Sequence, residues 1–287
     1  MAAALRRLVR LSLYLLLTLP LMPAQALLIA TGSAWKHRLP RLYHRLACRI
    51  LGFRIAVAGE PSALRPTLFV ANHVSYIDIE ILGSIIEGSF IAKTDVARWP
   101  LFGWLAKLQR TVFVDRRIRS TAEQRDAIRE RLDAGDDLIL FPEGTSGDGN
   151  HVLPFKSALF SVADHAGPRA LTVQPLSIAY LRLDGIPMGR AYRPFFAWYG
   201  DMTLGSHLWT MLGLGTVDVA VTFHAPVTLT QFGSRKALAE HCHRVIALGM
   251  ASALAGRPAV SEPPAQPTAE PAGHSSPATK PAREAAE

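Results

Sequence analysis

The chain has 287 residues, of which 49% are hydrophobic, with a formal net charge of +8 and two cysteines. This length suits one large domain or two small ones, and two isolated cysteines exclude a disulfide framework and a cysteine-based zinc site. The basic balance fits an anionic membrane leaflet, an acidic carrier protein or a phosphate-bearing substrate; without a recognisable nucleic-acid-reading motif, we expect no nucleic-acid partner.

The first 50 residues are predicted to bind a membrane. Residues 11–30 contain no charge and follow three arginines, and a helix of twenty mostly apolar residues is about 30 Å long, which matches the hydrocarbon thickness of a bilayer. The arginines favour a cytoplasmic N-terminus. Pro20 and Pro23 argue against one straight spanning helix, so the segment either spans the bilayer or lies in its interface. A cleaved secretory signal is the alternative, because Ala24-Gln25-Ala26 imitates a cleavage site.

Residues 34–50 are predicted to form a basic amphipathic helix. Their apolar residues recur at helical spacing between arginines and lysine. This pattern suits a helix at a membrane surface, and an ordinary domain helix with a solvated face has the same pattern. Pro40 interrupts the pattern, so we expect the regular helix to begin there, with proline in its first turn.

Residues 51–255 are predicted to form an α/β domain. Strands are predicted at 67–71, 89–92, 111–114, 138–141, 171–179, 195–199 and 217–223, and helices at 76–86, 98–108, 119–134, 157–166, 203–212 and 234–254. Short, continuous apolar strands separated by helices indicate a mostly parallel central sheet flanked by helices. The helix at 119–134 has capping-box spacing from Ser120 to Glu123 and is expected to stop near Gly135.

The C-terminal tail, residues 256–287, contains seven of the twenty prolines and almost no large apolar residue. Such a segment cannot bury a core, so we expect it to be disordered.

The stretch Asn72-His73-Val74-Ser75-Tyr76-Ile77-Asp78 follows the apolar run at 67–71. An imidazole takes up a proton near neutral pH, and a carboxylate can hold its ring in the useful tautomer. Along a continuous helix the two side chains would point about 140° apart, so they meet only if His73 lies in a strand-to-helix loop and Asp78 in the first helical turn. Because no nucleophile lies beside them, the pair predicts a general base for a hydroxyl of the substrate. A capped turn with a surface histidine is the alternative.

The predicted strand at 111–114 ends in Asp115-Arg116. Sites in parallel sheets collect beyond the C-terminal ends of the strands, so we expect this pair at the same edge as His73. Arg116 carries a planar, permanently charged guanidinium suited to phosphate or carboxylate. A salt bridge to Asp115 or a solvated loop charge is the alternative.

A glycine-rich stretch, Pro142-Glu143-Gly144-Thr145-Ser146-Gly147-Asp148-Gly149, follows the predicted strand at 138–141. Its glycines let the backbone approach a ligand closely and expose its amides. Glu143 is a candidate to accept hydrogen bonds from substrate hydroxyls or to orient Arg116, Thr145 and Ser146 add hydroxyl donors, and Lys156 adds a cation. A calcium loop would need more carboxylates, and a simple glycine-rich turn remains an alternative.

Two further features are expected to be structural. Pro175 lies inside a predicted strand, which implies a strand edge or a local break. The run His241-Cys242-His243 contains metal-ligating residue types, but adjacent helical residues point to different faces, so we expect solvated helix positions and no metal site.

Together these motifs resemble those of the lysophospholipid acyltransferases, the 1-acylglycerol-3-phosphate acyltransferase family. The family blocks N-H-x-x-x-x-D, a hydrophobic run ending in D-R, F-P-E-G-T, and a proline in a hydrophobic strand occur here in order. They begin at Asn72, Phe113, Phe141 and Pro175. The resemblance covers about residues 50–230, most of the folded part.

The resemblance implies an acyltransferase at the cytoplasmic side of the cell membrane. His73, oriented by Asp78, would deprotonate a lysolipid hydroxyl, which attacks the thioester of an acyl-coenzyme A or acyl carrier protein. Arg116 would bind the acceptor phosphate. No metal or other cofactor is expected.

The resemblance also assigns the acceptor-binding residues, with one departure. Glu143, Gly144 and Thr145 would position the glycerol part of the acceptor. Many members that use a phosphate acceptor carry arginine where this chain has Ser146, which weakens the phosphate assignment, although Lys156 could compensate. We therefore expect 1-acylglycerol-3-phosphate as the acceptor, with phosphatidic acid as product.

Lyso-ornithine lipid is the alternative acceptor. The stretches F-P-E-G-T-S-G-D-G and W-Y-G-D-M at 198–202 resemble the branch that acylates this zwitterionic aminolipid, and there Arg116 would bind carboxylate. A hydrolase would need a nucleophile, and the chain lacks a G-x-S-x-G elbow. A non-catalytic membrane-binding protein is the remaining alternative.

Overall fold

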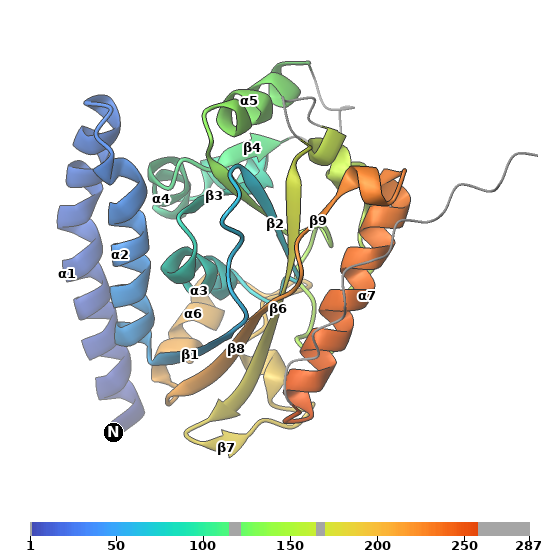
Figure 1. Cartoon of the computed structure of the whole chain (residues 1–287). Coiled ribbons are helices and arrows are strands. Elements are labelled where there is room, and N and C mark those ends of the chain that lie inside the picture. The colour runs from blue at the N-terminus through green and yellow to red at the C-terminus, as the bar shows by residue number, and fades with distance from the viewer. Residues whose placement is uncertain (1, 115–121, 165–169, 258–287) are drawn as a thin grey trace, which may run out of the picture.

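Alternate side chains of β2 (Thr67–Ala71) fill two separate cores, one on each face of a central sheet. Phe69 and Ala71 pack on one face, and Leu68 and Val70 pack on the other. All four side chains are buried, as a strand covered on both faces requires. The computed structural model describes residues 2–114, 122–164 and 170–257 (Figure 1).

Within these residues, nine strands form one sheet in the order β1-β8-β6-β2-β5-β3-β4, and β7 and β9 also pair with β6. β2 is parallel to β5 and β6, and β3 is parallel to β4 and β5, whereas β6 and β8 are antiparallel. The sheet is therefore mostly parallel, as expected. The other strands are β1 (Phe53–Ala58), β3 (Gly88–Lys93), β4 (Val112–Val114), β5 (Asp137–Leu140), β6 (Thr172–Leu183), β7 (Ile186–Pro187), β8 (Val217–Phe223) and β9 (Val227–Thr228).

Helices cover both faces of the sheet (Figure 1). α2, α3 and α6 pack on one face, and α1 lies outside α2; α5, α7 and the 3-10 helix η2 pack on the other face. The helices are α1 (Ala2–Ala30), α2 (Trp35–Leu51), α3 (Ile77–Ile85), α4 (Phe102–Leu108), α5 (Ala122–Asp133), α6 (Leu204–Gly213) and α7 (Arg235–Leu254), with 3-10 helices η1 (Thr94–Arg98), η2 (Ser157–Asp164), η3 (Arg193–Phe195) and η4 (Leu229–Gln231).

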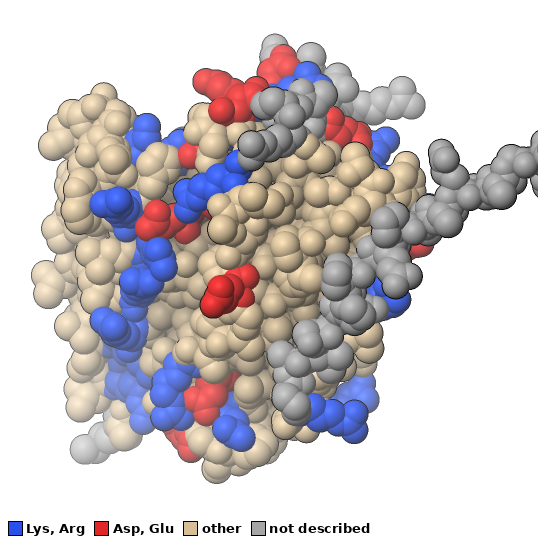
Figure 2. Space-filling model, in the orientation of Figure 1, with Lys and Arg blue, Asp and Glu red and all other residues tan. Residues whose placement is uncertain are grey.

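α1 and α2 form an antiparallel pair beside the sheet (Figure 1). Of the helices that the structure describes, α1 is the one long and apolar enough to cross a membrane, and large apolar residues such as Leu16 and Leu27 are exposed on it. Figure 2 shows a column of lysine and arginine over α2, next to the uncharged surface of α1. An apolar helix beside a basic one is typical of a membrane-associated protein.

The expected start of α2 at Pro40 is wrong, because the helix begins at Trp35 and contains Pro40. Proline has no N–H for the carbonyl of Lys36, four residues earlier. The side-chain amide of Gln25 on α1 donates to that carbonyl instead, at 2.9 Å. α1 likewise continues through Pro20 and Pro23. The proline positions in the helix pair were therefore poor guides to helix ends.

The predicted strand at 195–199 is also wrong. Residues Arg193–Phe195 form η3, and the segment runs on as turn and coil. Phe196 and Ala197 of this segment are buried by side-chain packing, and Phe196 stacks on Tyr180 with ring centroids 6.0 Å apart. The predicted strands at 67–71 and 217–223 match β2 and β8.

Pro175 lies in the interior of the sheet, paired with Val70 of β2, and not at an edge. On its other side β6 changes partner, from β9 at Val173 to β8 at Leu176. The missing N–H of Pro175 falls at this change, so the expected local break is confirmed.

Further expectations concern α7, the ends of α5 and the C-terminal tail. His241 and Cys242 are buried, so the expectation of solvated positions is wrong for them. α5 ends at Asp133, two residues before Gly135, which has a φ of +78°. Ser120, and the predicted tail from residue 258 on, lie outside the described residues.

Candidate active site

His73 and Asp78 meet at the C-terminal edge of the sheet. His73 lies in the loop between β2 and α3, and Asp78 lies in the first turn of α3. The Nδ1 atom of His73 is 2.9 Å from Oδ2 of Asp78. This is the loop-and-helix arrangement that the sequence spacing predicts. Since the carboxylate accepts, Nδ1 carries the proton, and Nε2 is left as the basic nitrogen.

The Asp78 carboxylate is completely buried and held by several donors. Its Oδ2 accepts the backbone N–H groups of Val74 and Ser75, at 2.6 and 2.9 Å, and its Oδ1 accepts the Tyr180 hydroxyl at 2.7 Å. Burial, together with the charge of Asp78, raises the pKa of Tyr180 well above its usual value. The phenol therefore stays a donor, and the carboxylate has little freedom to move.

The imidazole of His73 is partly exposed and stacks on Phe141, with ring centroids 4.1 Å apart. Phe141 stacks in turn on Phe90 of β3, at 6.2 Å. Among the residues that the structure describes, Nε2 of His73 has no hydrogen-bond partner. This nitrogen can therefore receive a proton from a bound hydroxyl.

The buried side chain of Glu143 links the glycine-rich loop after β5 to the loop that carries His73. Its carboxylate accepts the backbone N–H of His73 at 2.7 Å and that of Leu153 at 2.9 Å. The side chain is buried, and burial raises the pKa of Glu143 to about 8. The structure thus gives Glu143 a bracing role, because each of its carboxylate oxygens accepts a backbone N–H; its contact with substrate hydroxyls stays a prediction.

The other predicted binding residues are distributed around this loop. Gly144 adopts a φ of +76°, Thr145 and Lys156 are exposed, and the Ser146 hydroxyl donates to the carbonyl of Trp198. The loop is tied to the first motif, because the N–H of Gly147 donates to the His73 carbonyl at 2.9 Å. The expected binding residue Arg116 lies outside the described residues.

Two supporting residues tie the first motif to β6. The amide of Asn72 exchanges hydrogen bonds with the backbone of Ile178, at 2.8 and 3.0 Å. Tyr180, on the same strand, reaches Asp78. Sequence analysis missed Tyr180, because one tyrosine in an apolar strand carries no pattern of its own.

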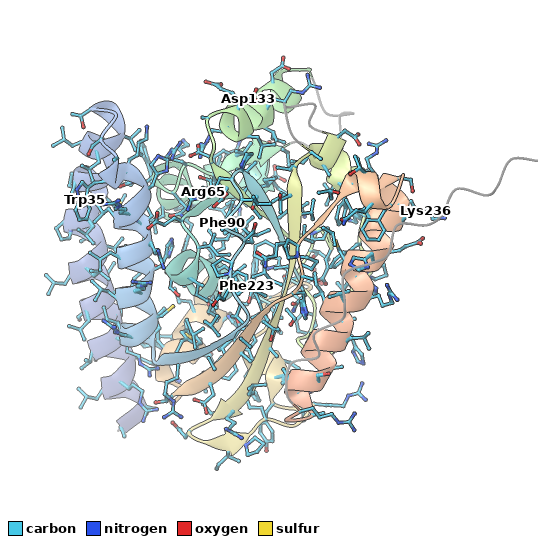
Figure 3. All side chains as sticks on the ribbon, in the orientation of Figure 1. Trp35, Arg65, Phe90, Asp133, Phe223 and Lys236 are labelled. Carbon is cyan, nitrogen blue, oxygen red and sulfur yellow. The ribbon has the colours of Figure 1, made fainter. Side chains whose placement is uncertain are left out.

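A mostly apolar cavity of about 180 Å³ opens between the N-terminal helices and the sheet. α1, α2, α3, α4, α6 and β3 line it. Phe90, labelled in Figure 3, belongs to its lining and is two stacked rings away from His73. The cavity therefore approaches the His73–Asp78 pair from the side of α1 and α2.

A buried polar cluster on the cavity wall joins α1 and α2 to α3. Glu80, on α3, accepts the Tyr14 hydroxyl at 2.8 Å and lies 2.6 Å from Nδ1 of His44. Tyr43 donates to Tyr14, and Nε2 of His44 is 3.0 Å from Oε1 of Gln109. Glu80 follows Asp78 by two residues, so the N-terminal helices are bonded to the helix that carries Asp78.

Comparison with known proteins agrees with this geometry. A family described as Acyltransferase matches residues 54–179, a range that contains His73, Asp78 and Glu143. A lyso-ornithine lipid O-acyltransferase of Brucella abortus is 46% identical over 84% of this chain and 92% of its own length. The chain belongs to this acyltransferase family.

Other relatives carry two different names. A lyso-ornithine lipid O-acyltransferase of Rhizobium meliloti is 42% identical over 85% of this chain and 86% of its own length. A 1-acyl-sn-glycerol-3-phosphate acyltransferase of Neisseria gonorrhoeae is 33% identical over 63% of this chain and 68% of its own length. This acyltransferase therefore acts on a lysolipid.

The fold matches a solved structure as well. The 1-acyl-sn-glycerophosphate acyltransferase PlsC of Thermotoga maritima superposes with a TM-score of 0.61, covering 88% of this acyltransferase and 98% of that chain, at 24% identity. The match confirms the expected α/β fold.

Proposed function

We propose that this acyltransferase moves a fatty acyl group to the hydroxyl of lyso-ornithine lipid. The observation that carries this choice is the difference in similarity: relatives with that name are 46%, 42%, 36% and 35% identical, against 33% for a Neisseria relative named for 1-acylglycerol-3-phosphate. Ser146, which supplies no cation for a phosphate monoester, supports the same choice. Our first expectation, 1-acylglycerol-3-phosphate, is kept as the second candidate because of the Neisseria relative.

The proposed reaction uses His73 as a general base. Nε2 takes the proton of the lysolipid hydroxyl while its oxygen attacks the thioester carbonyl of acyl-coenzyme A or acyl carrier protein. The C–S bond then breaks, and the leaving thiolate accepts the proton from the imidazolium of His73. Asp78 holds the ring and stabilises the imidazolium. This step needs no metal or organic cofactor, since the imidazole moves the proton and a thiolate is a competent leaving group.

The cavity beside Phe90 is suited to hold a fatty chain. Its lining is mostly apolar, and burying a chain there gives about 0.8 kcal/mol per methylene. α1 forms part of that lining through Leu11, Leu21 and Met22. We therefore propose that α1 is retained in the mature protein and that the domain lies on the cytoplasmic side of the cell membrane, next to the pools of acyl-coenzyme A and acyl carrier protein.

A parallel assay tests the proposal. The purified protein in lipid vesicles is given a labelled acyl donor with lyso-ornithine lipid, with 1-acylglycerol-3-phosphate, or with neither. We expect the doubly acylated aminolipid as main product; product from only the phosphate acceptor contradicts the acceptor choice, and free fatty acid alone indicates a hydrolase.

His73→Ala should lower the rate of acyl transfer at least about 100-fold, as expected for a lost general base, while vesicle binding persists. His243→Ala, on α7, is the matched control and should leave the rate unchanged. A His73 variant with unchanged turnover contradicts the assigned base.

A further inference from the structure

The segment between β7 and α6 forms a wall beside the His73–Asp78 pair. The N–H of Trp198 donates to the Val74 carbonyl at 3.0 Å, and the Ser146 hydroxyl donates to the Trp198 carbonyl. Gly149 packs between these parts: a Cβ there would lie 3.2 Å from a Val74 methyl and 3.7 Å from Cβ of Arg193. The wall is thus fastened to the loop that carries His73.

Asn150 contacts two arginines of this wall, Arg193 through its side chain and Arg190 through its backbone. The guanidinium of Arg193 donates to Oδ1 of Asn150 at 2.8 Å, and Nδ2 of Asn150 donates to the Arg190 carbonyl at 3.2 Å. The guanidinium of Arg190 lies 3.1 Å from Nε2 of His151. Asn150 therefore holds the side chain of Arg193 and the backbone of Arg190, while His151 contacts the Arg190 guanidinium.

Neither arginine forms an ion pair with a carboxylate in the part of the chain that the structure describes, although the charge of Asp148 acts on Arg193. Nε of Arg193 is buried without a hydrogen-bond partner. Partial burial and the neighbouring charge of Arg190 lower the pKa of Arg193. Two close like charges are suited to an oxyanion that accepts from the planar guanidinium groups.

One carboxylate of opposite sign lies in the same cluster. Both oxygens of Asp148 accept from Asn150, one from its backbone N–H at 2.9 Å and one from its amide at 3.1 Å. These bonds lower the pKa of Asp148 although its burial acts against them. Asp148 is part-exposed, and its Oδ1 lies 3.9 Å from Nδ1 of the exposed His151, so its charge can also meet a cation from solvent. The cluster thus offers guanidinium and carboxylate side by side.

The cluster is within reach of a headgroup whose hydroxyl is at His73. Gly147 is bonded to the His73 carbonyl, and the three residues from there to Asn150 span at most about 10 Å. The phosphates of an acyl donor lie at the far end of a much longer pantetheine arm. The exposed, stacked rings of Tyr192 and Phe195 flank the arginines, as an amphiphilic ligand would require.

We propose that Arg193, aided by Arg190 and Asn150, binds the oxyanion of the acceptor headgroup, and that Asp148 binds its ammonium group. This inference rests on the proposed function and adds a site for a zwitterionic amino-acid headgroup. A phosphate monoester would use the arginines alone and would be repelled by Asp148.

Steady-state kinetics of single variants test the site, with acceptor and donor titrated separately. Arg193→Gln should raise KM for both lysolipids about tenfold or more, as expected when hydrogen bonds between charged groups are lost, with little change in kcat. Asp148→Asn should raise KM about fivefold for lyso-ornithine lipid and not for 1-acylglycerol-3-phosphate. KM for the acyl donor should stay unchanged in both variants.

The control is Arg235→Gln at the start of α7. This exposed arginine pairs with Asp164. It follows β9 closely in the chain, and Thr228 of β9 pairs with Thr172 at the start of β6, which also pairs with Thr67 at the start of β2. Arg235 therefore lies near the sheet edge opposite His73. Its substitution should leave all constants unchanged. Arg193→Lys, which keeps the charge without the planar fork, should give an intermediate KM and replaces the Gln variant if that one does not fold.

The outcomes separate the two proposals. A wild-type protein that acylates neither lysolipid contradicts the proposed function. An active wild-type protein whose Arg193 variants keep an unchanged acceptor KM contradicts this inference alone. A KM increase confined to the acyl donor assigns Arg193 to the donor phosphates and also overturns the inference.

Discussion

The carboxylate of Glu143 accepts the backbone N–H of His73 at 2.7 Å, across 70 residues of sequence. β2 and β5 are parallel neighbours, with Val70 opposite Leu140, so the loops that follow them leave the sheet side by side. Glu143 uses this proximity to fix the backbone on which the imidazole is mounted. A residue of the second motif thus sets the geometry of the first.

Glu143→Ala should therefore destabilise the fold and lower kcat together. It leaves the part-buried N–H groups of His73 and Leu153 without their acceptors, at about 1–3 kcal/mol each. We expect a fall of several kcal/mol in the free energy of unfolding, measured by denaturant titration in detergent, and a lower kcat with little change in acceptor KM. A variant that unfolds like wild type and has only a raised KM would show that Glu143 binds substrate.

Asp78→Asn should fold but lose activity. The Asn oxygen can keep the hydrogen bonds from Val74 and Ser75, while its amide nitrogen donates to Tyr180, whose hydroxyl can turn to accept. The charge that stabilises imidazolium is lost, so kcat should fall roughly 100-fold or more. Melting temperature and kcat measured on the same preparation check this.

Tyr180→Phe is the matched control for Asp78→Asn. It removes one bond to the carboxylate and leaves the charge, so it should cost about 1–2 kcal/mol of stability and less than tenfold in kcat. An Asn variant with kcat near that of wild type would contradict the role given to Asp78.

The His44–Glu80 pair should make stability depend on pH. Burial alone would lower the pKa of His44, but the Glu80 carboxylate 2.6 Å away outweighs it, and the pKa is raised. A histidine with a raised folded pKa contributes stability that is complete below its unfolded pKa of about 6.5 and is lost as pH rises through the folded value. The melting-temperature difference between wild type and His44→Gln should therefore shrink as pH rises above about 6.5.

Glu80→Gln is the control for this pH dependence, because it removes the charge and keeps the size of the side chain. In that background burial lowers the pKa of His44, so the effect of substituting His44 should no longer shrink with pH and should instead grow as pH rises through about 6.5. A difference between wild type and His44→Gln that grows with pH would refute the assignment.

Filling the cavity should shorten the preferred acyl chain. Ala106 on α4 lines the cavity and is only half-buried, so Ala106→Phe can place its ring inside without remodelling a tight core. We expect a shift toward shorter fatty chains in a competition assay with donors of mixed length. Lys107→Ala, at an exposed neighbouring position, should leave the preference unchanged; equal chain preference in wild type and Ala106→Phe would place the fatty chain elsewhere.

The fold and the His73–Asp78 pair were predictable because their signals are local. Buried parallel strands such as β2 read as continuous apolar runs, and polar residues directly after them must lie at one edge. β1 gave no such signal, because it is an edge strand with several exposed residues.

The remaining parts depend on contacts between distant segments. Pro40 is tolerated inside α2 only because Gln25 on another helix satisfies the Lys36 carbonyl. The position of Arg193 beside Val74 depends on a wall that follows β7. Neither relation leaves a periodic pattern in the sequence, so propensity and spacing could not reveal it.

The first helix contributes side chains to the cavity wall and a hydroxyl to Glu80. A fatty tail lying in a bilayer around this helix can slide into the protein sideways, without first being extracted into water. The reaction rate should then follow the mole fraction of lysolipid in the vesicle surface and stay nearly constant when the whole suspension is diluted. Removing the first helix would open the cavity wall and should abolish the reaction at the membrane surface.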